Sequence, residues 1–154
     1  MSFHITDRQK GENPDLESIR RLMVPVLAEL KIVDLDLEIE LLDDQQIAKL
    51  NEKFFCRFRP TNVISFPQEG TSGHLGDVVV SVETSRRETE TLGYSLEEGI
   101  AYYLIHGILH LLGYEHVGVE AEVAAAMEQR QDELFELALN GSNYLNAGTD
   151  LQAG

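Results

Sequence analysis

The chain has 154 residues, of which 43% are hydrophobic and 25% are charged. This length fits one domain with a hydrophobic core, which excludes a disordered chain, a fibrous protein and a small disulfide-stapled scaffold. The net charge of −15 is the opposite of what is usual in a nucleic-acid-binding domain. The single cysteine, Cys56, cannot form an internal disulfide, and the first residues lack the pattern of a secretory signal. We therefore expect a cytosolic location.

The basic residues are unevenly distributed along this acidic chain. Five of the twelve fall in one middle stretch: Lys53, Arg57, Arg59, Arg86 and Arg87. No acidic residue lies between the first of these and Gln68. The sequence therefore leaves two alternatives open, a local positive patch or a set of solvated surface charges.

The first part of the chain is predicted to alternate strands and helices. Hydrophobic periodicity indicates a strand at 3–6, a helix from Asn13-Pro14 to 30, a strand at 35–41 and a helix from 43 or 44 to 55. Apolar and acidic residues alternate through 35–41, which is typical of an exposed or edge strand. Pro25 is expected to kink the first helix.

The second part is predicted to contain two strands and then three helices. These are strands at 63–66 and 78–82 around a loop at 68–76, and helices at 84–92, 95–113 and 119–139. The helix at 95–113 begins with a capping box, Ser95 to Glu98, and is apolar on nearly every side, so we place it at the buried centre. The fold class is α+β, with one domain at 1–140 and a disordered tail at 141–154. No segment is long and apolar enough to suggest a membrane partner.

Three histidines lie in one short segment, at His106, His110 and His116. Histidines four apart on a helix project from the same face, about 6 Å apart along the axis. Gly113 lets the chain turn out of the helix and bring His116 back toward that face. Burial of three unpaired imidazoles is unfavourable, whereas a metal satisfies all three. Three imidazoles with one open position are typical of a catalytic zinc site.

Gly107 distinguishes this segment from the long zinc motif of the metzincin proteases, which has the same spacing. Those enzymes carry a glutamate directly after the first histidine, where it acts as the general base. Gly107 has no carboxylate, so the sequence disfavours an ordinary protease.

Three segments resemble the YbeY-type endoribonucleases, small bacterial metalloproteins linked to ribosomal RNA maturation and ribosome quality control. They are Pro60-Thr-Asn-Val-Ile-Ser-Phe-Pro67, Leu75-Gly-Asp-Val78 followed by Ser81, and the histidine segment 106–116. The resemblance implies an α+β fold with a small mixed sheet, one zinc ion held by His106, His110 and His116, and hydrolysis of single-stranded RNA. It also implies ribosomal RNA and the ribosome or its proteins as partners.

One departure from the family concerns a cation near the substrate. Most relatives carry a Tyr-Arg pair where this chain has Phe54-Phe55, and the resemblance implies that this arginine helps catalysis or phosphate binding. Arg57 and Arg59 are the candidates to replace its charge, because guanidinium groups bind phosphate in a bidentate manner. The alternative for both is ordinary surface charge.

Three further residues are candidates for the site. Glu115, where relatives carry aspartate, is a candidate to orient a ligand imidazole or move protons, with a solvent-facing acid as the alternative. Asn62 and Ser65 are candidates to line the substrate cleft, although Asn62 is also suited to closing a turn.

The sequence therefore predicts a zinc-dependent endoribonuclease specific for single strands. Two alternatives stay open. One is a zinc hydrolase of another substrate, such as a peptide. The other is a ribosome-associated zinc protein whose catalysis is weak or lost.

Overall fold

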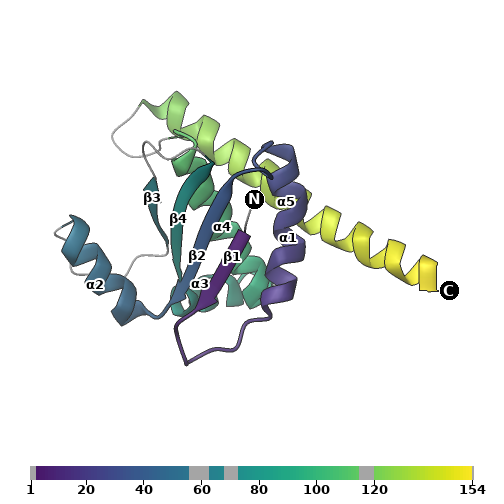
Figure 1. Cartoon of the computed structure of the whole chain (residues 1–154), viewed down its shortest axis with the longest axis horizontal. Coiled ribbons are helices and arrows are strands. Elements are labelled where there is room, and N and C mark those ends of the chain that lie inside the picture. Colours follow the sequence, from purple (N-terminus) through teal and green to yellow (C-terminus); the bar gives the residue numbers. More distant parts are fainter. Residues whose placement is uncertain (1–2, 56–62, 68–72, 115–119, 154) are drawn as a thin grey trace.

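The computed structural model describes residues 3–55, 63–67, 73–114 and 120–153, with the backbone alone for 54–55 and 142–153. Helices and a four-stranded sheet form an α+β fold, as predicted (Figure 1). In chain order the elements are β1 (Phe3–Asp7), α1 (Leu16–Glu29), β2 (Asp36–Leu42), α2 (Asp44–Phe55), β3 (Val63–Pro67), β4 (His74–Ser81), α3 (Val82–Glu90), α4 (Leu96–Leu111) and α5 (Ala121–Ala153).

The sheet is mixed, which confirms the expectation. Its strand order is β1-β2-β4-β3, where β1, β2 and β4 are parallel and β3 runs antiparallel to β4. The strand predicted at 35–41 corresponds to β2. Of the two alternatives, an exposed or an edge strand, the edge strand is wrong, since β2 lies between β1 and β4. Its alternating pattern reflects one buried face and one exposed face. Leu37, Ile39 and Leu41 face the core, whereas Glu38 and Glu40 lie on the other face near His4 and Arg8.

The helix α4 lies at the centre of the core. Its buried residues join those of α1 and α5 and the buried side chains of β2 and β4 in one cluster. The predicted capping box is present: the Ser95 hydroxyl accepts from the Glu98 amide, and the Glu98 carboxylate accepts from the Ser95 amide. A second, smaller cluster of Leu42, Ile47, Ile64 and Val79 holds α2 against the sheet.

Several boundaries differ from those predicted. The α1 helix begins after Asp15, whose carboxylate accepts from the amides of Glu17 and Ser18, so Asp15 and not Asn13 is the N-cap. The β4 strand begins at His74, inside the predicted loop 68–76, because its first residues pair with β2 and β3.

The segment predicted as a disordered tail is helical in the structure, since α5 continues to Ala153. Figure 1 shows its C-terminal part extending past α1, away from the sheet. A Cβ placed at Gly141 would lie 2.8 Å from Cγ of Pro25. Gly141 therefore marks a close passage of α5 over α1 and not a helix end. Beyond it, each added residue gains a backbone hydrogen bond without a new nucleation step.

Candidate functional site

The last two turns of α4 bring His106 and His110 together. Their Nε2 atoms lie 3.1 Å apart, and their ring centroids lie 4.7 Å apart at an interplanar angle of 71°. Both side chains are half-buried, whereas the helix residues between them are buried. The two imidazoles therefore lie side by side along α4.

This geometry fits a shared metal ion. Two imidazole nitrogens that each bind zinc at about 2.0–2.1 Å in a tetrahedral site lie about 3.3 Å from one another. The observed 3.1 Å separation of the two Nε2 atoms is close to that value. The third candidate, His116, lies outside the described residues. Within the described residues, no group of three histidine, cysteine or acidic side chains could hold a metal ion.

The α4 helix ends where the sequence predicts. The Gly113 amide donates to His110 at 3.0 Å and the Tyr114 amide donates to Leu109 at 3.0 Å, which together form a Schellman motif. Gly113 has a φ of 100°, a conformation that L-residues adopt at a cost. The glycine thus turns the chain out of the helix three residues after His110.

Gly107, between the two histidines, packs α4 against the sheet. A Cβ at this position would lie 2.6 Å from Cγ1 of Val78 and 3.0 Å from both the Ser65 hydroxyl and Cγ2 of Val63. The Ser65 hydroxyl donates to the Gly107 carbonyl oxygen at 2.8 Å. A glutamate, as in the metzincins, therefore has no room here.

Ser65, predicted to line the substrate cleft, is half-buried against α4. Its contact with substrate stays a prediction.

A residue that the sequence analysis missed supports His106. Gln131 on α5 places its Oε1 atom 2.9 Å from Nδ1 of His106, and its side chain is only 5% exposed. Gln131 lies on the same buried stripe of α5 as Met127 and Leu134. A glutamine inside an otherwise apolar stripe was the available signal.

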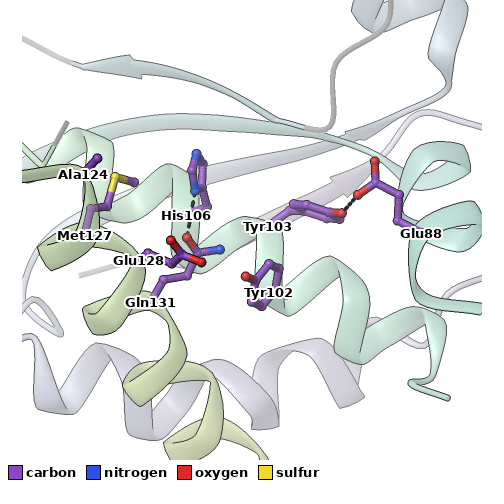
Figure 2. A pocket seen from close by; sticks show the side chains of 8 residues that line it. All are labelled: Glu88, Tyr102, Tyr103, His106, Ala124, Met127, Glu128 and Gln131. Carbon is purple, nitrogen blue, oxygen red and sulfur yellow. Dashed lines mark hydrogen bonds between the residues drawn. The ribbon is translucent and has the colours of Figure 1, made fainter. Parts of the chain in front are cut away.

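A cavity of about 510 Å³ opens beside His106 between α3, α4 and α5 (Figure 2). Its lining includes His106, Gln131 and the carboxylates of Glu88 and Glu128, and none of the described residues that line it is a lysine or an arginine. The Tyr103 hydroxyl donates to Glu88. Burial raises the pKa of the Tyr102 hydroxyl, and the nearby carboxylates of Asp132 and Glu128 raise it further. The carboxylates of Glu88 and Glu128 therefore make the part of the cavity that they line unfavourable for a phosphate.

Two arginines of the proposed positive patch are held by acidic partners. Arg86 binds Glu12 at 2.8 Å, and Arg87 binds Asp44 at 2.7 Å. Their charges are locally compensated. The other members of the patch are Lys53 and the arginines at 57 and 59, and these two arginines lie outside the described residues.

The model of the family described as Endoribonuclease YbeY matches residues 4–138. The chain belongs to the YbeY endoribonuclease family. It is similar to Endoribonuclease YbeY of Syntrophotalea carbinolica, with 37% identity over 86% of this chain and 93% of the relative. It is also similar to Endoribonuclease YbeY of Geobacter sulfurreducens, with 35% identity over 92% of this chain and 98% of the relative. The fold resembles the solution structure of TM1509 from Thermotoga maritima, with a TM-score of 0.59 and 25% identity over 88% of this chain and 90% of that one.

The other site residues predicted for this YbeY-family chain lie outside the described residues. They are Arg57, Arg59, Asn62, Glu115 and His116. The structure therefore places two of the three predicted metal ligands and Ser65, and it leaves the catalytic and the other substrate-binding assignments as predictions.

Proposed function

We propose that this YbeY-family chain is a zinc-dependent endoribonuclease that cleaves single-stranded RNA, with one zinc ion held by His106, His110 and His116. One observation carries the proposal: the Nε2 atoms of His106 and His110 converge to 3.1 Å in the part of the chain that the family model covers. The His116 assignment rests on the spacing and the family resemblance. The curated relatives named Endoribonuclease YbeY support cleavage of RNA.

The chain lacks a carboxylate beside the first histidine, and a zinc ion is compatible with that absence. When bound, zinc supplies Lewis-acid polarisation of a phosphoryl oxygen and acidification of water, so a strong protein base at residue 107 is unnecessary. In our proposal, Arg57 and Arg59 neutralise the phosphates on either side of the scissile bond. Glu115 moves a proton or orients a ligand imidazole.

The resemblance also supports ribosomal RNA as the substrate, with ribosome quality control as the cellular role and the cytosol as the location. Among the helices of the described part of the chain, none is both long and apolar enough to cross a membrane. The net charge of −15 weakens nonspecific attraction to RNA. We therefore expect binding to depend on a local group of cations and on the ribosome itself.

A substrate screen tests the proposal. The zinc-loaded protein is incubated with a single-stranded RNA, the same RNA annealed to its complement, a DNA of the same sequence and an unstructured peptide. We expect internal cleavage of the single-stranded RNA alone. Peptide cleavage would instead support a hydrolase of another class. Zinc binding without cleavage of any substrate would support a ribosome-associated protein that has lost catalysis, as the Phe54-Phe55 departure would explain.

A further inference from the structure

The side chain of Gln131 approaches the candidate metal ligand His106 on the side away from His110. Its Oε1 atom lies 2.9 Å from Nδ1 of His106, whereas Nε2 of the same ring lies 3.1 Å from Nε2 of His110 (Figure 2 shows the first contact). Both ring nitrogens of His106 are thus engaged, one with α5 and the other with its own helix. The contact at one nitrogen therefore determines which of the two nitrogens carries the proton.

A neutral imidazole carries one proton, on either Nδ1 or Nε2, and only the unprotonated nitrogen can bind a metal. A carbonyl oxygen can only accept a hydrogen bond. The contact with Oε1 of Gln131 therefore requires the proton of His106 to be on Nδ1. The lone pair is then on Nε2, the atom that faces His110.

Gln131 is well placed to hold this arrangement. Its side chain is 5% exposed, and its neighbours along the same face of α5, Met127 and Leu134, are each 1% exposed. Rotation of the carboxamide by half a turn would leave two donors facing each other or force the proton of His106 onto Nε2. Water competes weakly for so buried a group, so the penalty for an unmade hydrogen bond is large.

We propose that Gln131 is a positioning residue of the metal site, which selects the Nδ1-protonated tautomer of His106 and so prepares Nε2 for the metal. This inference rests on the proposed function in that it takes His106 as a ligand. In the metal-free protein, the Nε2 proton between the two rings then belongs to His110, which donates it to His106. Partners that orient ligand imidazoles in this way typically change metal affinity by about 10- to 100-fold.

Three variants separate this role from simple packing. Gln131→Leu keeps a similar volume but removes the acceptor. Gln131→Glu restores an oxygen acceptor at the same position. Gln129→Leu changes an exposed glutamine of the same helix, whose amide binds Glu133, and serves as the matched control.

The first readout is the affinity for zinc, measured in competition with a chromophoric chelator. We expect Gln131→Leu to bind zinc about 10- to 100-fold more weakly than the unmodified protein. The zinc affinities of Gln131→Glu and Gln129→Leu should be at most about threefold lower than that of the unmodified protein. Thermal unfolding of the metal-free variants shows whether each is folded. Should Gln131→Leu fail to fold, a weakened affinity of the folded Gln131→Glu variant would equally contradict the proposal.

The second readout is the tautomer itself, observed by ¹⁵N NMR of the histidine rings in the metal-free protein at about pH 8, where imidazoles are neutral. We expect the proton of His106 on Nδ1 in the unmodified protein and in Gln131→Glu. A proton on Nε2 of His106 in the unmodified protein would overturn the inference. This result does not depend on whether the protein binds zinc or cleaves RNA, so failure of the proposed function is distinguishable from failure of this inference.

Discussion

The hydroxyl of Ser65 donates a 2.8 Å hydrogen bond to the carbonyl oxygen of Gly107, which joins β3 to α4 between the two metal-ligand candidates. The bond is possible because Gly107 brings the helix unusually close to the sheet. The same closeness removes the space that a metzincin-type glutamate would occupy. The packing of one helix turn thus accounts for a chemical difference from the zinc proteases.

Gly107→Ala tests this packing. Alanine ordinarily stabilises a helix by about 1 kcal/mol relative to glycine. Here its Cβ would lie 2.6 Å from Cγ1 of Val78, so we expect a net loss of about 1–3 kcal/mol in the free energy of unfolding, measured with urea. Gly11→Ala, whose Cβ would meet only Gln9 at 3.9 Å, is the control and should change little.

A double-mutant cycle sharpens the test. Val78→Ala removes the methyl group that the new Cβ would strike. The combined variant should therefore be more stable than the sum of the two single losses predicts. Strict additivity, or a Gly107→Ala protein as stable as the unmodified one, would show that α4 is not held in this way.

His110→Ala tests the metal site through stability. A ligand that binds only the folded state stabilises it by about 2.7 kcal/mol at a hundredfold excess over its dissociation constant. We expect zinc to raise the unfolding temperature of the unmodified protein and of His74→Ala, but not of His110→Ala. The effect should fade below about pH 6, because an imidazole must be neutral to bind a metal. Equal stabilisation of both variants would exclude His110 as a ligand.

Much of this site follows from local sequence patterns. The capping box at Ser95 and the turn at Gly113 set the ends of α4, and a spacing of four residues places His106 and His110 on one face. Each of these features depends on residues within one or two helical turns. Sequence reasoning handles such short-range relations well.

The features that sequence reasoning missed depend on distant residues. Gln131 is 25 positions from His106, and only the packing of α5 on α4 brings them together. Arg86 is 74 positions from its partner Glu12, so the sequence could not show that its charge is compensated. The choice between an exposed and an edge strand at β2 was open for a similar reason, since an alternating pattern shows that one face is exposed but not how many strands lie beside it.

Arg59→Ala tests the proposed phosphate contacts. Each phosphate neutralised on a single strand contributes about −0.7 to the slope of log affinity against log salt concentration. We expect Arg59→Ala to reduce the slope by about one contact. Arg87→Ala is the control, because Arg87 already binds Asp44 and should leave the slope unchanged. An identical slope for Arg59→Ala and the unmodified protein would assign Arg59 to the ordinary surface.

Asp44→Asn tests the link between α2 and α3 through its pH dependence. Burial raises the pKa of the Asp44 carboxyl, but hydrogen bonds from Ser81, Arg87 and Thr84 outweigh this and lower that pKa overall. A lowered pKa stabilises the folded state above the unfolded pKa of about 3.9, and this contribution is lost as the pH falls through the folded value.

At pH 7 we therefore expect Asp44→Asn to lose about 1.5–3 kcal/mol in the free energy of unfolding, since hydrogen bonds to a charged group contribute in this range. The difference from the unmodified protein should shrink as the pH falls below about 4. Asp34→Asn changes an exposed carboxyl and should show no such difference. A loss that stays constant between pH 7 and pH 3 would show that the charge of Asp44 is not what stabilises the fold.

The central claim, that His106 and His110 belong to a metal centre for RNA cleavage, is tested most directly by one comparison. An end-labelled single-stranded RNA is treated with the zinc-loaded protein, the protein stripped by a chelator, the stripped protein with zinc restored, and His110→Ala with excess zinc. We predict internal cleavage in the first and third reactions only. Equal cleavage by the stripped protein or by His110→Ala would contradict the account.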